Sequence, residues 1–258
     1  MALLFLKRTL RQAAFLACHA GLRTLGREPA ATVFILGHMR SGSTLLLHIL
    51  LSHPDIAGRG EQNTPYRTVR DLHRLAMTAR FAQGPLLRRF RYVVDQINHD
   101  RFTPNEALLQ DSRVRLLFLI REPPASLSSI VHLTRTFYAE WPMQRVADYY
   151  VQRLNTLARY AELSAHDGRA LPLSYQALVA DTSSTLGRLR AFLDLETGLS
   201  ERYDMQPFTG CRGDPSDTIR AGRIVRDREP PRVEIPADVL DRAWQAYDAC
   251  RRVLEGLD

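Results

Sequence analysis

The chain has 258 residues, with 35 Lys and Arg against 28 Asp and Glu, and a formal net charge of +7. Hydrophobic residues make up 45% of it, which excludes a disordered or fibrous protein and suffices for a full core. Lys7 is the only lysine and lies near the N-terminus, so no lysine can serve a Walker-type phosphate loop. The excess of arginine favours an anionic ligand.

Residues 1–29 form an N-terminal tail in which apolar residues recur at helical spacing, with Lys7, Arg8 and Arg11 mostly elsewhere. This pattern predicts an amphipathic helix, which either lies on a membrane surface through residues 1–25 or packs on its own domain. The apolar residues precede the charges, the reverse of a secretory signal, and no run reaches the length of a membrane span.

The remaining residues, 30–258, alternate strands with helices and are expected to form one domain. We predict buried strands at residues 32–36, 113–120 and 170–173. Helices are predicted at residues 43–52, 61–91 with a break at Gly84-Pro85, 123 onwards, 142–165, 182–193 and 236–256, and a long loop at 207–231. This order favours a three-layer α/β/α fold of the P-loop type, with a mostly parallel sheet covered by helices on both faces.

The strongest local signal is the segment Gly37-His-Met-Arg-Ser-Gly-Ser-Thr44, between a predicted strand and a predicted helix. Small residues there let backbone N–H groups converge on a phosphate, and the helix N-terminus adds positive charge. Ser43 stands where a Walker loop carries lysine, so Arg40 supplies the cation. Because no predicted strand ends in an evident magnesium-binding Asp, we expect no metal and disfavour the alternative of a small-molecule kinase using ATP.

The stretch FILGHMRSGSTLL, at residues 34–46, resembles the 5′-phosphosulfate loop of sulfotransferases that use 3′-phosphoadenosine 5′-phosphosulfate (PAPS). It is most similar to the bacterial and Golgi-type loop Arg-Ser-Gly-Thr-Thr-Leu. The resemblance implies a sulfotransferase domain over residues 30–258 and PAPS as co-substrate. It also implies binding of the 5′-phosphosulfate by the loop residues Arg40, Ser41, Gly42, Ser43 and Thr44.

A second motif strengthens the resemblance, since Arg121 ends a predicted strand and Ser129 follows eight residues later in a helix. In the family, an Arg and a Ser at this spacing hold the 3′-phosphate of the nucleotide. An arginine fork gives two bonds to a phosphate, and a hydroxyl adds a third donor.

Two further stretches agree with the family pattern. Residues 171–181 resemble its strand followed by Tyr-Glu-Asp-Leu, which implies that Tyr175 lies near the adenine or a phosphate. Residues 210–224 resemble its C-terminal loop that closes over the nucleotide. Arg212, Arg220 and Arg223 are therefore candidate phosphate contacts.

Two residues are candidates for the base that takes the acceptor proton. Glu61 lies 21 residues after Arg40, as in tyrosylprotein-type relatives whose base is a glutamate. His99 lies 22 residues before Arg121, about where cytosolic-type relatives carry their catalytic histidine. His99 also matches a lysine that steadies the transition state in the tyrosylprotein type. We favour Glu61, with Arg40 balancing the charge of the transferring group.

The sequence indicates the acceptor substrate less clearly than the nucleotide. Arginines between residues 62 and 92 suit a glycan, a glycolipid or a lipid-linked acceptor, or a small molecule, and no nucleic-acid-binding motif is present. Three widely separated cysteines, without disulfide or metal-ligand spacing, favour a reducing compartment. We expect a bacterial, cytoplasmic protein, located at the inner face of the membrane if the tail binds lipid.

Overall fold

The computed structural model describes residues 30–82, 89–164, 168–210, 217–226, 231 and 233–257. The predicted tail helix of residues 1–29 lies outside these residues. None of the helices in the described ranges combines the length and apolar character that a bilayer crossing requires.

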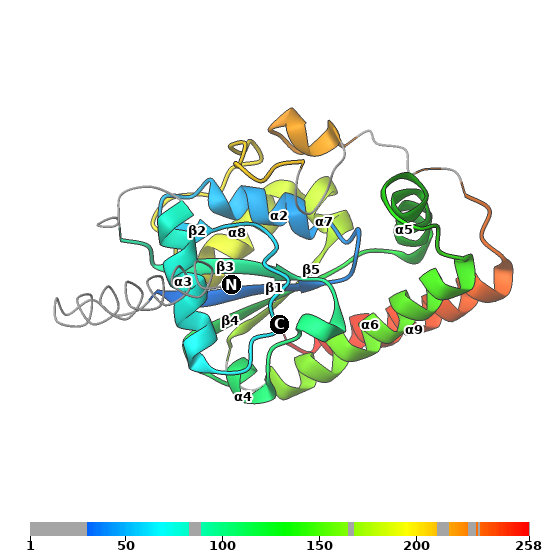
Figure 1. Ribbon diagram of the computed structural model, residues 1–258, viewed down its shortest axis with the longest axis horizontal. Coiled ribbons are helices and arrows are strands. Elements are labelled where there is room, and N and C mark those ends of the chain that lie inside the picture. The colour runs from blue at the N-terminus through cyan, green and yellow to red at the C-terminus, as the bar shows by residue number, and fades with distance from the viewer. Residues whose placement is uncertain are drawn as a thin grey trace, which may run out of the picture.

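A five-stranded sheet lies at the centre of the fold, with the strand order β2-β3-β1-β4-β5 (Figure 1). Every neighbouring pair is parallel. The strands are β1 (Ala31–Gly37), β2 (Ile56–Gly58), β3 (Tyr92–Ile97), β4 (Val114–Ile120) and β5 (Ala170–Ser174). This confirms the predicted mostly parallel sheet and its α/β class.

Helices cover both faces of the sheet. One layer contains α2 (Ser43–Leu51), α7 (Tyr175–Ala180) and α8 (Thr182–Phe192). The opposite layer contains α3 (Val69–Ala82), α4 (Glu106–Leu109), α5 (Pro123–Phe137), α6 (Met143–Ser164) and α9 (Ala237–Glu255). Figure 1 shows α2, α7 and α8 above the sheet and α4, α6 and α9 below it. Two 3₁₀ turns, η1 (Asp100–Phe102) and η2 (Asp217–Ala221), complete the elements in the described part of the chain.

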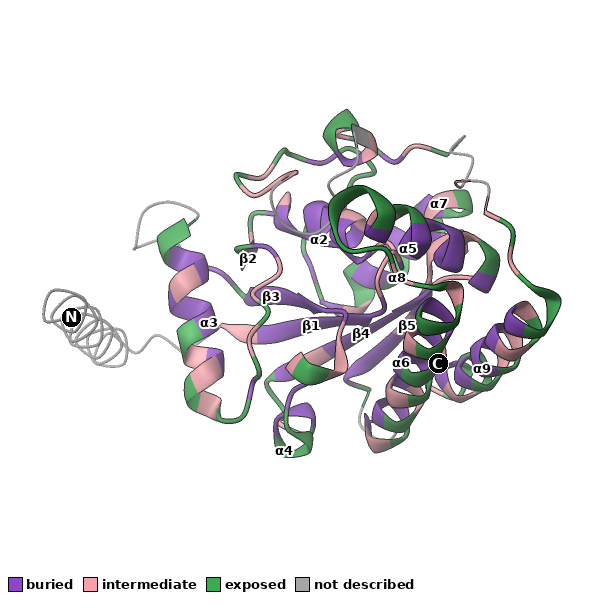
Figure 2. Ribbon diagram, turned by 45° about the vertical axis from the view of Figure 1, so that its right-hand side comes forward, coloured by how far each residue is buried: buried purple, intermediate pink, exposed green. Residues whose placement is uncertain are grey.

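Alternating side chains of the central strand divide the core into two halves. Val33 and Ile35 pack towards α2 and α8, whereas Phe34 and Leu36 pack towards α6 and α9. Figure 2 shows the strands buried between the layers, with the outward faces of α6 and α9 exposed. Because the strands are parallel, their carboxyl ends all meet at one edge, where ligands of such folds bind.

The segment predicted as a helix over residues 61–91 is corrected by the structure. Among the described residues of this segment, only Val69–Ala82 is helical and residues 61–67 have no regular structure, and the strand β3 (Tyr92–Ile97) follows it. Pro65 offers no backbone N–H, and Asn63 has a φ of 50°, a left-handed conformation that interrupts a helix. The strand β3 was not predicted, because the polar residues Asp95 and Gln96 interrupt its apolar run.

Candidate active site

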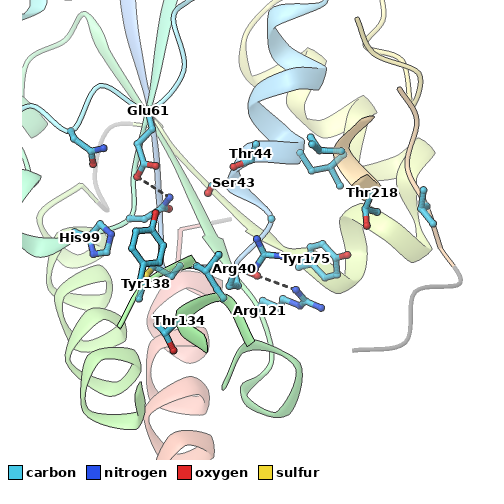
Figure 3. Close-up of a pocket in the computed structure, with 18 of the residues that line it drawn as sticks. Arg40, Ser43, Thr44, Glu61, His99, Arg121, Thr134, Tyr138, Tyr175 and Thr218 are labelled. Atoms are coloured by element: carbon cyan, nitrogen blue, oxygen red, sulfur yellow. Dashed lines mark hydrogen bonds between the residues drawn. The ribbon is translucent and has the colours of Figure 1, made fainter. Parts of the chain in front are cut away.

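A cavity of about 360 Å³ lies outside the carboxyl ends of β1, β3 and β4. This volume lies within the range of pockets that bind small molecules and cofactors, about 300–1,000 Å³. Nine of the predicted site residues line it, and Figure 3 shows most of them facing a common space: Arg40, Gly42, Ser43, Thr44, Glu61, His99, Arg121, Tyr175 and Arg223.

The turn between β1 and α2 has the shape of an anion-binding loop. Arg40 and Gly42 both have left-handed backbone conformations, with φ of 67° and 95°. Gly42 is the N-cap of α2, and no side chain caps the helix. The first N–H groups of α2 therefore lack helical acceptors and point, with the side chains of Ser43 and Thr44, at the cavity.

Tyr175, the first residue of α7, closes this loop from the side. A Cβ atom on Gly42 would lie 2.5 Å from Cδ2 of the Tyr175 ring. The Arg121 guanidinium stacks over the same ring, with its Cζ 4.1 Å from the centroid. The ring thus supports both the loop and the arginine, and a glycine is required where it touches the loop.

Replacement of Gly42 by alanine is expected to weaken binding of 3′-phosphoadenosine 5′-phosphate (PAP) about tenfold. The added methyl group would displace Tyr175, and the left-handed conformation costs about 1–3 kcal/mol for such a residue. Calorimetric titration with PAP measures the effect. Gly187→Ala is the matched control, because a Cβ on Gly187 meets no atom within 4 Å; equal affinity of Gly42→Ala and wild type would contradict this role of the loop.

The two predicted phosphate-binding arginines are linked through the loop. Arg40 Nε donates to Oγ of Ser129 at 2.8 Å, and Arg121 Nη1 donates to the backbone oxygen of Arg40 at 3.0 Å. Residues from β1, β4 and α5, far apart in sequence, therefore come together. Figure 3 shows the bond between Arg40 and Arg121 at the Tyr175 end of the cavity.

His38, which the sequence did not single out, joins the same two strand ends. Its Nε2 accepts the backbone N–H of Arg121 at 3.2 Å, so its Nδ1 carries the proton and donates to the Met39 oxygen at 2.8 Å. Complete burial lowers the pKa of His38 to about 3, with Arg121 and Arg153 contributing. The imidazole therefore stays neutral and holds the loop against the end of β4.

Two side chains of α6 form hydrogen bonds with the backbone at and next to the ends of β1 and β3. The Tyr149 hydroxyl accepts the Met39 N–H at 2.7 Å and donates to the Asn98 oxygen at 2.6 Å. Arg153, fully buried, donates to the backbone oxygens of Gly37 and Ile97, both at 2.7 Å. These bonds fix the ends of β1 and β3 relative to each other. Arg153 was not among the predicted site residues, although an arginine on the apolar face of a predicted helix could have indicated it.

Glu61 and His99 both lie at the other end of the cavity (Figure 3). Asn98 Nδ2 donates to Oε1 of Glu61 at 3.4 Å. Burial raises the pKa of Glu61 above its ordinary value, although bonds from Gln96 and Asn98 and the charge of Arg101 oppose the change. Burial lowers the pKa of His99 to about 4, aided by Arg101 and Arg153.

The remaining predicted site residues lie elsewhere. Ser41 is buried beside Gly37, and its N–H donates to the His38 oxygen, so it shapes the turn. Ser129 lies behind Arg40 and touches its guanidinium. Arg220 is exposed and its guanidinium packs on Gly210, whereas Arg223 lines the cavity. Arg212 lies outside the described residues.

The cavity carries a net positive charge. Four arginines line it, Arg40, Arg101, Arg121 and Arg223, against one carboxylate, that of Glu61. Low-dielectric walls strengthen this field, which favours a ligand with several negative charges. Within the described ranges, no three His, Cys, Asp or Glu side chains gather as they would around a metal ion.

Comparison with known proteins shows what the part of the chain that carries this site resembles. The model of the sulfotransferase family matches residues 32–112, the part that carries Arg40, Glu61 and His99. No curated protein matches the sequence.

Solved structures share the fold over most of the chain. The sulfotransferase domain of the Synechococcus PCC 7002 olefin synthase has 18% identity and a TM-score of 0.60, over 86% of this chain and 95% of that domain. The sulfotransferase domain from the curacin biosynthetic pathway has 16% identity and a TM-score of 0.54, over 86% and 98%. A sulfotransferase from Alicyclobacillus acidocaldarius has 14% identity and a TM-score of 0.50, over 87% and 94%. This chain is thus similar to sulfotransferases in sequence over residues 32–112 and in fold over most of its length.

Proposed function

We propose that this protein is a sulfotransferase, which transfers the sulfuryl group of PAPS to a hydroxyl of its acceptor. One observation carries the proposal: a single cavity has two linked arginines, Arg40 and Arg121, at one end and the half-buried carboxylate of Glu61 at the other. The first end suits the phosphates of a nucleotide, and the second end suits the proton of a hydroxyl.

The residues at the nucleotide end fit PAPS. The first N–H groups of α2, with Ser43, Thr44 and Arg40, would hold the 5′-phosphosulfate. Arg121, which lines the cavity next to Arg40, would hold the 3′-phosphate, and Ser129 would hold the Arg40 side chain in place. The absence of a side chain on Gly42 lets the Tyr175 ring pack directly against this loop.

The reaction exchanges one S–O bond for another. The acceptor oxygen forms a bond to sulfur, the bond from sulfur to the bridging phosphate oxygen breaks, and Glu61 takes the acceptor proton. Negative charge then builds on the bridging oxygen, which leaves with PAP. Arg40 balances that charge without giving up a proton, because a guanidinium stays protonated at neutral pH.

The different pKa changes of the two candidate bases favour Glu61. A general base works best when its pKa lies near the working pH. Burial moves the pKa of Glu61 up towards neutrality but lowers that of His99 to about 4, which makes His99 a weaker base. His99 remains neutral at pH 7 and can donate a hydrogen bond.

Replacement of His99 by asparagine is expected to lower kcat by less than about tenfold, because the amide keeps a hydrogen-bond donor while Glu61 remains as base. Steady-state kinetics at saturating PAPS measures the effect. A loss of kcat near 10³-fold, together with an active Glu61→Gln variant, would move the base to His99.

The alternative of a small-molecule kinase would need other residues at the loop. Ser43 occupies the position of the phosphate-binding lysine, and Lys7 is the only lysine. We therefore propose that turnover proceeds in EDTA and that ATP is no donor. Transfer of ³²P from γ-labelled ATP, dependent on magnesium, would favour the kinase.

The acceptor end of the cavity combines apolar and aromatic side chains with side-chain amides. Leu133, Tyr138 and Trp141 line one part of it, and Asn63 and Asn98 line another. Rings that stack on aromatic side chains and hydroxyls that bond to amides fit such a surface, so we propose a glycan or glycolipid acceptor. A panel of ³⁵S transfer assays with sugars, glycolipids, phenols and simple alcohols tests this, and exclusive labelling of phenols would contradict it.

A further inference from the structure

Glu61 lies on a stretch of chain that has no regular structure of its own. From Glu61 to Pro65 only one hydrogen bond joins a backbone N–H to another element, within the described residues: Gln62 N donates to Oδ1 of Asp95 at 3.2 Å. The neighbour of the proposed base is thus fixed by a side chain of β3.

Asp95 accepts two further hydrogen bonds, one from Tyr66 at the end of this stretch and one from its own strand. The Tyr66 hydroxyl donates to Oδ2 of Asp95 at 2.5 Å, and the N–H of Gln96 donates to Oδ1 at 2.9 Å. Tyr66 is only 2% exposed, and its ring packs on Phe34 of β1, with centroids 4.9 Å apart. Both ends of the segment between Gln62 and Tyr66 are therefore bound to one carboxyl group.

Asp95 occupies a position where an apolar residue would be expected. On β3 it lies on the same face as Val93 and Ile97, which belong to the core between the sheet and α6. Asp95 is 1% exposed, and burial raises its pKa to about 7. A carboxyl group in such a place lowers stability unless donors satisfy it. A carboxyl group at this position is explained if its hydrogen bonds hold the segment that carries Glu61.

We propose that Asp95 is a positioning residue, which holds Glu61 at the acceptor end of the cavity through Gln62 and Tyr66. This inference rests on the proposed function, because it gives Asp95 a role only through the base. Asp95 does not line the cavity. Its effect is expected on kcat and not on binding of the nucleotide, whose proposed contacts come from α2 and from the residues that follow β1 and β4.

Three variants separate this role from a purely structural one. Asp95→Leu removes all acceptors and is expected to lower kcat about 10²-fold, the effect of a reacting group misplaced by about 1 Å. Asp95→Asn keeps an acceptor for Gln62 and is expected to stay within about threefold of wild type. Tyr66→Phe removes one bond while its ring stays packed, and is expected to fall between the two.

The matched control is Asp111→Leu, at the opposite edge of the sheet, where the carboxylate bonds to Arg113. It is expected to leave kcat unchanged. In each variant the melting temperature and the affinity for PAP report whether the fold is intact. If Asp95→Leu does not fold, the comparison of Tyr66→Phe with wild type decides.

A double-mutant cycle with Glu61→Gln gives the sharpest test. If Asp95 acts through Glu61, Asp95→Leu adds less than about twofold to the loss already caused by Glu61→Gln. The proposal would be overturned if the loss of kcat in the double variant equalled the product of the losses in the two single variants. An unchanged kcat in folded Asp95→Leu and Tyr66→Phe would also overturn it. Absence of any sulfuryl transfer by wild type is a separate result, which refutes the proposed function and this inference together.

Discussion

Glu61→Gln is expected to lower kcat by about 10³-fold while the affinity for PAP stays within about twofold. Glutamine keeps the size of the side chain and its contact with Asn98, but it cannot accept a proton, and general base catalysis contributes about 10²–10⁴-fold. Steady-state kinetics and calorimetric titration with PAP measure the two quantities.

The pH profile of this reaction follows from the same residue. Burial raises the pKa of Glu61 above 4.5, and only the ionised carboxylate acts as base, so activity falls as pH drops through a value above 4.5. The acidic limb should vanish in Glu61→Gln. Glu106→Gln, an exposed Glu that pairs with Arg159, is the control and should keep the wild-type profile. Near-normal turnover by Glu61→Gln would refute Glu61 as base.

Arg121→Ala is expected to weaken the binding of PAP by about 10²-fold and to erase the preference for its 3′-phosphate. Hydrogen bonds to charged groups contribute about 1.5–3 kcal/mol each, and an arginine fork makes two of them. Removal of the guanidinium also leaves the Arg40 oxygen and the Tyr175 ring without their contact.

Comparison of PAP with adenosine 5′-phosphate isolates the 3′-phosphate from that indirect effect. Wild type should prefer PAP strongly, whereas Arg121→Ala should bind both ligands with similar affinity. Arg115→Ala, on the same strand but bonded to the Ser112 oxygen, is the control and should discriminate as wild type does. Unchanged discrimination by Arg121→Ala would contradict the assignment of the 3′-phosphate to this arginine.

The sequence was most informative where a motif coincides with the end of a strand. Gly37 ends β1 and Ile120 ends β4, so the loop after Gly37 and Arg121 after Ile120 had to meet at one edge of a parallel sheet. Helix and strand periodicity located these elements, and the family pattern suggested the ligand. The contact of Arg121 with Arg40 follows from this topology.

The supporting residues could not be predicted, because each of them acts through a contact between distant segments. His38 bonds to Arg121, Tyr149 to Met39 and Asn98, and Asp95 to Gln62 and Tyr66. Such pairs leave no periodic signal. The strand β3 was missed for a related reason, since the polar side chains that serve the site interrupt the apolar run that marks a buried strand.

Transfer of ³⁵S from labelled PAPS to the acceptor panel, in EDTA, tests the central claim most directly. Wild type is expected to label an acceptor and release PAP in equal amounts, and Glu61→Gln is expected to lose both. Failure of wild type to bind PAP or to transfer the label to any acceptor, while it transfers ³²P from ATP with magnesium, would contradict sulfuryl transfer in this cavity.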